Sequence, residues 1–210
     1  MVIGQSFTEP SPPILRCSSA KMAATRGEDS EDKSISMRVA LFGIRNAFPS
    51  VKQMDTGELA KFIEGNKYKN LILLDVREQD EYDVSHLPNA IRVKPDEPVD
   101  QVMTKIKQCL ENITDHHVQI LCYCSVGYRS SNMVQKLYPE FKILKEMQKI
   151  DITSELCNLE GSIFKWANEG KELVDCNNAK TKYCHPYNFL YGKLLDAKLR
   201  VYEPVSTIVQ

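Results

Sequence analysis

The chain has 210 residues, of which 42% are hydrophobic and 26% are charged, and its formal net charge is -1. These values are typical of a globular protein and give no sign of a general affinity for nucleic acid or for an anionic membrane surface. The sequence has no run of 18 apolar residues, so we expect no transmembrane helix.

Residues 1–36 are predicted to be a disordered N-terminal extension. The stretch "TEPSPP" is rich in proline and "RGEDSEDKS" is a run of charges, and such segments bury too little apolar area to offset chain entropy. Met22 could also serve as a start site. The first 21 residues hold one acid, Glu9, which leaves a mitochondrial transit peptide open as an alternative, although sparse arginine and several prolines disfavour it.

Residues 50–172 are predicted to form one α/β domain, because strand and helix patterns alternate along them. The near-continuous apolar runs are typical of strands buried on both faces, which indicates a mainly parallel central sheet flanked by helices on both faces. The first half should contain a strand at 51–54, a helix capped by Asp55 and Glu58, strands at 70–76 and 90–93, and between them a short helix ended by Pro88. The second half should contain a helix from Pro98, a strand at 118–123, a helix at 130–138 stopped by Pro139, and a strand-turn-helix over 156–170.

Residues 173–210 are predicted to be a C-terminal tail. The stretch "CHPYNFLYGKLLDAKLR" could pack back on the domain as a helix or dock a protein partner. Cys184 and His185 lack a second ligand pair at metal spacing, so we expect no zinc site there.

Seven cysteines are spaced irregularly, and most of them fall in apolar patterns. An odd, scattered set indicates free thiols in a reducing compartment rather than a disulfide framework. We therefore expect a cytoplasmic protein, with a mitochondrial location as the alternative. The cysteines are residues 17, 109, 122, 124, 157, 176 and 184.

Cys124 occupies a distinctive position, where a buried strand ends and a helix begins. The first N–H groups of a helix have no intrahelical partners, and the helix dipole adds positive potential, so this loop predicts an anion cradle that favours the thiolate. Gly127 permits unusual backbone angles, and Arg129 adds a permanent cation. Such a cradle suits attack either on a phosphate ester or on a sulfane sulfur.

The loop Cys124-Ser125-Val126-Gly127-Tyr128-Arg129 reads C-x-x-G-x-R and resembles the active-site loop of single-domain rhodaneses, which are sulfurtransferases. Dual-specificity and tyrosine phosphatases have five residues between the cysteine and the arginine, whereas this chain has four. The segment "LLDVREQDEYDVSHLPNAIRV" is similar to the rhodanese pattern D-V-R, E-(Y/F), G-H-I-P-G-A, with Ser85 and Asn89 where glycine is usual. The stretch "LEGSIFKW" resembles the late L-x-G-G-x-x-x-W motif and keeps one glycine, Gly161.

The resemblance covers about residues 50–172 and implies sulfur transfer from a small anionic donor, such as thiosulfate, to a thiol or cyanide acceptor, with no metal or organic cofactor. Cys124 would be the nucleophile and would carry the persulfide. The predicted substrate-binding loop consists of Ser125, Val126, Gly127, Tyr128, Arg129 and Ser130.

Several side chains around the loop are assigned supporting roles. Asp75 and Arg77 are expected to support the loop, and Arg77 to form an ion pair with Glu81. We expect His86 to be structural and Cys122 to be a core thiol. The alternatives are a non-catalytic rhodanese-like interaction module and, less favoured by the loop length, a cysteine-dependent phosphatase or arsenate reductase.

Overall fold

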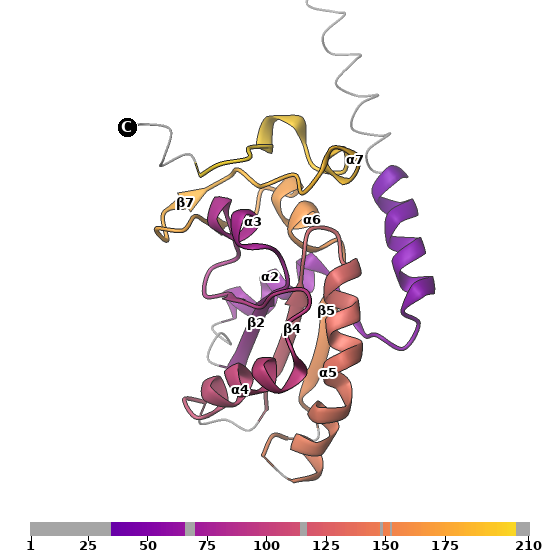
Figure 1. The fold of residues 1–210 in the computed structure, drawn as a ribbon, viewed down its shortest axis with the longest axis vertical. Coiled ribbons are helices and arrows are strands. Elements are labelled where there is room, and N and C mark those ends of the chain that lie inside the picture. The colour runs from indigo at the N-terminus through magenta and orange to yellow at the C-terminus, as the bar shows by residue number, and fades with distance from the viewer. Residues whose placement is uncertain (1–34, 66–69, 114–116, 148, 152, 205–210) are drawn as a thin grey trace, which may run out of the picture.

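Five parallel strands form the central sheet in the computed structural model, which describes residues 35–204 except 66–69, 114–116, 148 and 152 (Figure 1). Their order is β1-β5-β4-β2-β3, and each neighbouring pair is parallel. The α/β fold with a parallel central sheet is therefore confirmed. The strands are β1 (Gln53–Met54), β2 (Leu71–Asp75), β3 (Ile91–Arg92), β4 (Gln119–Tyr123) and β5 (Glu155–Leu159).

Helices cover both faces of the sheet (Figure 1). Helix α4 packs against α5 on one face, and α2 packs against α6 on the other. The predicted capping box of Asp55 and Glu58 is present at the start of α2. Among the described residues, no helix is long and apolar enough to cross a membrane. These helices, with the short α3 between β2 and β3, are α2 (Thr56–Glu64), α3 (Gln79–Val84), α4 (Val99–Leu110), α5 (Tyr128–Glu146) and α6 (Ser162–Asn168).

Helix α5 is longer than the sequence suggested. We expected Pro139 to end it, but the helix runs through this proline to Glu146. A proline in a helix interior removes one hydrogen bond and crowds the preceding turn, at a cost of about 3 kcal/mol. The residues beyond it include Phe141 and Leu144, which are buried in the core, and each such burial contributes about 1.5–3 kcal/mol. Packing of the last turns therefore offsets the proline.

The hydrophobic core extends beyond residues 50–172 at both ends. A helix over residues 35–47 buries Met37, Leu41 and Ile44 in the same core. The predicted disordered extension, residues 1–36, lies outside the described residues except for its last two, which belong to this helix.

The C-terminal segment folds back along the top of the domain in Figure 1, where it lies close to α3 and α6. Its hairpin joins β6 (Leu173–Val174) to β7 (Lys180–Thr181), and it continues into α7 (Phe189–Gly192) and the short 3-10 helix η2 (Ala197–Leu199). Backbone hydrogen bonds between His86 and Val174, 2.8 and 2.9 Å long, tie the hairpin to the segment after α3.

Candidate functional site

Cys124 follows the last residue of β4, the middle strand of the sheet, and α5 begins four residues later. Gly127 N–H donates a hydrogen bond to Cys124 Sγ at 3.1 Å. Cys124 N–H donates to Ser162 Oγ, also at 3.1 Å, and this hydroxyl donates to the carbonyl of Leu159. The sulfur thus lies in front of the first turn of α5, whose N–H groups have no intrahelical acceptors.

Gly127 adopts a backbone conformation that other residues resist. Its φ is 127°, and an added Cβ would lie 3.2 Å from Nδ2 of Asn158 and 3.7 Å from both Ser162 Oγ and Ile44 Cδ1. The site therefore depends on a glycine for conformation and for space. Ile44 belongs to the 35–47 helix, so that helix also reaches the loop.

Arg129 is bound to Glu81. Its two terminal nitrogens donate to the two carboxylate oxygens at 2.6 and 2.8 Å, and one of them also donates to Ser125 Oγ at 2.8 Å. Ser125 Oγ in turn donates to Glu81 at 2.6 Å. Burial alone would raise the pKa of Glu81, but the hydrogen bonds and charge of Arg129 outweigh it and hold that pKa below its ordinary value. The arrangement indicates that Arg129 braces the loop.

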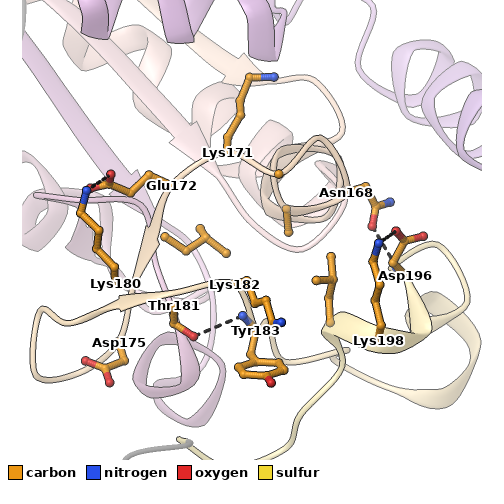
Figure 2. A pocket seen from close by; sticks show the side chains of 14 residues that line it. Asn168, Lys171, Glu172, Asp175, Lys180, Thr181, Lys182, Tyr183, Asp196 and Lys198 are labelled. Carbon is orange, nitrogen blue, oxygen red and sulfur yellow. Dashed lines mark hydrogen bonds and ion pairs between the residues drawn. The ribbon is translucent and has the colours of Figure 1, made fainter.

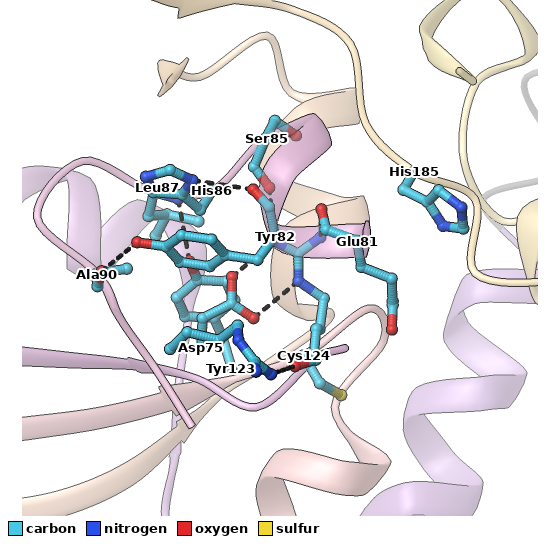
Figure 3. A network of polar contacts seen from close by, with 12 residues as sticks. Asp75, Glu81, Tyr82, Ser85, His86, Leu87, Ala90, Tyr123, Cys124 and His185 are labelled. Atoms are coloured by element: carbon cyan, nitrogen blue, oxygen red, sulfur yellow. Dashed lines mark hydrogen bonds and ion pairs between the residues drawn. The ribbon is translucent and has the colours of Figure 1, made fainter. Parts of the chain in front are cut away.

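Asp75 and Arg77 form a second ion pair, and both of its side chains are fully buried. Arg77 donates to the two oxygens of Asp75 at 2.8 and 2.6 Å and to the carbonyls of Glu81 and Ser85 (Figure 3). The expected ion pair between Arg77 and Glu81 is wrong. Arg77 precedes α3, which begins at Gln79, so the two residues are not one turn apart on a helix and only the backbone of Glu81 is held. Asp75 and Arg77 therefore reach the Cys124 loop indirectly, through Glu81.

The region around His86 is structural, as expected. Its Nδ1 lies 3.0 Å from the carbonyl of Tyr82, and the two rings stack with their centroids 3.8 Å apart. Tyr82 donates to the carbonyl of Ala90, and Leu87 N–H donates to the hydroxyl of Tyr123 (Figure 3). These bonds fix the segment that presents Glu81.

The other described cysteines are free thiols and do not line the cavity at Cys124. Cys122 is fully buried in β4, and burial raises the pKa of its thiol. Burial also raises the pKa of Cys157 to about 11 and of Cys184 to about 12. These thiols stay protonated at neutral pH, which fits the core role predicted for Cys122.

A cavity of about 90 Å³ lies over Cys124. It brings together four of the predicted loop residues, whereas Gly127 and Ser130 are not part of its lining. The hydroxyl of Ser130 is buried and, in the part of the chain that the structure describes, has no hydrogen-bond partner. The lining consists of Cys124, Ser125, Val126, Tyr128, Arg129, Tyr187 and Tyr191.

Three features of the site escaped the sequence reasoning. Glu81 was assigned to the wrong partner, Ser162 was overlooked as a hydrogen-bond partner of the Cys124 backbone, and Tyr187 and Tyr191 were not connected with the loop at all. The signal for Ser162 was its place in the late motif, where a second glycine is usual. The aromatic cluster in "HPYNFLYG" was the signal for the tyrosines.

A larger hollow, of about 900 Å³, lies elsewhere, between α6, the β6–β7 hairpin and η2 (Figure 2). Two of its lysines lie close to acids: Lys180 is 2.6 Å from Glu172, and Lys198 is 3.9 Å from Asp196. None of its lining residues belongs to the Cys124 loop. Of the two, only the smaller cavity is lined by Cys124.

A cysteine at the carboxyl end of a central parallel strand, next to the N-terminus of the following helix, defines an α/β protein with a thiol at a position that favours negative charge. The chain matches the rhodanese-like domain family over residues 55–169, more than half of its length, and it belongs to this family. The resemblance drawn from its motifs is thus confirmed.

The individual relatives share only a small part of their sequence with this chain. The chain is 27% identical over 112 residues to "Adenylyltransferase and sulfurtransferase UBA4" of Debaryomyces hansenii, a match that covers 53% of this chain and only 22% of that protein. Among solved structures, thiosulfate sulfurtransferase from Pseudomonas aeruginosa is 20% identical with a TM-score of 0.48, covering 64% of this chain and 22% of the other. As-Sb reductase from Leishmania major is 10% identical with a TM-score of 0.47, covering 63% and 92%. At TM-scores below 0.5, these structural likenesses carry no argument about chemistry.

Proposed function

We propose that this protein is a sulfurtransferase that carries a sulfane sulfur as a persulfide on Cys124. The observation that carries the proposal is the position of Cys124 Sγ, which accepts a hydrogen bond from Gly127 N–H at 3.1 Å in front of the first turn of α5. Hydrogen bonds to a sulfur anion and a helix N-terminus both stabilise negative charge there. The family, and a relative whose name includes sulfurtransferase, support this reading.

The proposed reaction has two balanced halves. In the first, the Cys124 thiolate attacks the outer sulfur of a donor such as thiosulfate, so that a new S–S bond forms, the donor's S–S bond breaks and sulfite leaves with the electron pair. In the second, a thiol or cyanide attacks the outer sulfur of the persulfide, and the Cys124 thiolate is regenerated. Gly127 N–H, which donates to Cys124 Sγ, would stabilise the anion at both stages.

Two other functions fit the geometry less well. A phosphate ester would place three oxygens in the cradle, each needing donors at about 2.7–3.1 Å, in a loop one residue shorter than that of phosphatases. A purely non-catalytic module would not require a cysteine held by Gly127 N–H in front of a helix N-terminus. Both alternatives predict that no cyanide-labile sulfur accumulates on the protein.

The test compares two cysteines that lie two residues apart. Wild type and Cys122→Ser should gain one sulfur by intact mass after thiosulfate treatment, lose it to cyanide, and form thiocyanate. Cys124→Ser should gain no sulfur and form no thiocyanate. Sulfur transfer that survives in Cys124→Ser would overturn the assignment of the nucleophile. Aryl phosphate hydrolysis by a wild-type protein that forms no persulfide would replace the proposal by the phosphatase alternative.

A further inference from the structure

Residues 185–192, here called the aromatic lid, contribute Tyr187 and Tyr191 to the wall of the cavity over Cys124. The ring of Tyr187 covers the guanidinium of Arg129, with Cζ 4.4 Å from the ring centroid. Tyr191 lines the same cavity, and its ring centroid lies 6.0 Å from that of Tyr187. With Tyr128 on the loop side, three tyrosines line the cavity that Cys124 shares. The lid lies beyond residue 169, where the rhodanese-like match ends.

The lid is held in a defined position. Tyr187 has a φ of 62°, a left-handed conformation that costs a bulky residue about 1–3 kcal/mol and persists only where its surroundings impose it. Its N–H donates to Nδ1 of His185 at 3.1 Å, and the buried His185 ring meets Tyr202 edge-on at 5.4 Å. At the other end, Asn188 caps α7 by accepting a hydrogen bond from Tyr191 N–H. These contacts place the ring of Tyr187 on Arg129.

The cavity that Tyr187 and Tyr191 help to line leaves little room beside Cys124. Cys124 is only 2% exposed, and the cavity of about 90 Å³ is far smaller than the roughly 300–1,000 Å³ of pockets that enclose a drug-sized ligand. Only the reacting end of a donor fits beside the sulfur. Both donors react through a single terminal sulfur, but the atom behind it carries three oxygens in thiosulfate, whereas in an alkyl hydropersulfide, R–S–SH, it carries one slender chain.

The lid also leaves little positive charge for a doubly charged donor. Arg129 is the one cation among the described residues that line the cavity, and both of its terminal nitrogens are bound to the Glu81 carboxylate. The ring of Tyr187 covers the guanidinium. Aromatic rings present a negative face, so a dianion that enters past Tyr187 and Tyr191 gains little and loses its hydration.

We propose that the aromatic lid determines donor choice, and that Tyr187 selects slender alkyl hydropersulfides, R–S–SH, which carry at most one negative charge, over the thiosulfate dianion. This inference rests on the proposed sulfurtransferase function. The Cys124 thiolate attacks the terminal sulfur of R–S–SH, a Cys124 S–S bond forms, and the donor's S–S bond breaks. The product is Cys124–S–SH, and the leaving thiolate RS⁻ takes a proton from water.

The experiment measures how fast Cys124 gains one sulfur from 2-hydroxyethyl hydropersulfide and from thiosulfate, by intact mass. Tyr187→Gly removes the ring while glycine tolerates the left-handed backbone, so the fold is spared. We expect the hydropersulfide-to-thiosulfate rate ratio to fall about tenfold in Tyr187→Gly, which corresponds to about 1.4 kcal/mol. Tyr187→Phe keeps the ring and should retain the wild-type ratio. Phe189→Ala is the matched control, because Phe189 is on the same segment but 81% exposed and outside the cavity lining.

A second pair of reagents separates the lid from the sulfur chemistry. Iodoacetamide and iodoacetate have nearly the same shape, but only iodoacetate is charged. Wild-type Cys124 should favour iodoacetamide, and Tyr187→Gly should narrow this preference, whether or not the protein transfers sulfur. If neither donor forms a persulfide, the proposed function fails while the alkylation ratios still test the lid. Equal ratios in wild type and Tyr187→Gly, for donors and for alkylating reagents alike, would overturn the inference.

Discussion

Replacing Glu81 by glutamine should destabilise the protein in a pH-dependent way. Glu81 is the acceptor for both Arg129 and Ser125, so it connects α3 to the Cys124 loop. In Glu81→Gln the side chain keeps its size and one acceptor oxygen but loses its charge. The guanidinium of Arg129 is then left without a carboxylate.

The size of the effect follows from burial. The side chain of Glu81 is 2% exposed and that of Arg129 is 18% exposed. Removing one partner of a buried ion pair costs about 3–5 kcal/mol, and the partial exposure of Arg129 and the remaining hydrogen bonds reduce this to about 2–3 kcal/mol. For a domain of this size such a loss lowers the melting temperature by roughly 5–10 °C.

The pH dependence has a definite sign. Burial works to raise the pKa of Glu81, but Arg129 outweighs it, and the native pKa lies below the ordinary value. Such a group adds stability above its unfolded pKa of about 4.3 and loses it as the pH falls through the native pKa. The difference in the free energy of unfolding between wild type and Glu81→Gln should therefore be full at neutral pH and shrink below about pH 5.

Urea unfolding at a series of pH values measures this difference. Glu172→Gln is the matched control, because its partner Lys180 is 78% exposed and the pair should contribute less than about 1 kcal/mol. A Glu81→Gln variant as stable as wild type at neutral pH would refute the reasoning. So would a difference that stays constant down to about pH 3.5, since Glu81 would then not be the titrating group.

Three further predictions concern the loop and its neighbours. Gly127→Ala should abolish persulfide formation, measured by intact mass, and cost about 1–3 kcal/mol of stability, measured by urea unfolding. The reason is that φ of Gly127 is 127° and that neighbouring atoms fill the space a Cβ would need. A fully active alanine variant would contradict this. Iodoacetamide at about pH 8 should modify Cys124 in the folded protein and spare Cys122, whose thiol pKa is raised by burial; peptide mass mapping that finds Cys122 modified first would be the opposite result. In thermal denaturation, a chain beginning at residue 35 should melt within about 2 °C of the full chain. A chain beginning at Phe48 loses three buried apolar residues and should melt roughly 5–10 °C lower. Equal melting temperatures for all three chains would show that the 35–47 helix adds no stability.

The sequence predicted those parts of the fold that depend on local patterns. The apolar runs at 70–76 and 118–123 are strands because they are buried on both faces, and Cys124 lies at the end of the second one, as expected. Asn89, which replaces a usual glycine, indeed has a φ of 62°, a conformation that asparagine tolerates. Predictions from local sequence fail where contacts with distant residues determine the structure. Pro139, for example, lies inside α5 because the residues that follow it are buried in the core.

The candidate site was less predictable because its partners are distant in the sequence. Glu81 and Arg129 are 48 residues apart, and no spacing rule pairs them. The lid tyrosines lie still further along, in a segment without helical or strand periodicity. Motif reasoning therefore identified the nucleophile and its loop as candidates, but it could not identify what binds Arg129 or what covers Cys124.

These contacts form one connected path from the sheet to the lid. Asp75, at the end of β2, accepts hydrogen bonds from Arg77, and Arg77 donates to the backbone carbonyl of Glu81. The carboxylate of Glu81 binds Arg129, and the ring of Tyr187 covers the guanidinium of Arg129. Arg129 is shared by the loop, α3 and the lid, so its charge is used inside the protein and is not left to attract an anion. The N–H groups of the Cys124 loop are then free to stabilise the sulfur. Tyr187, which covers Arg129, selects the donor that reaches the sulfur. The rhodanese-like motifs account for the first property, and only the segment beyond them accounts for the second.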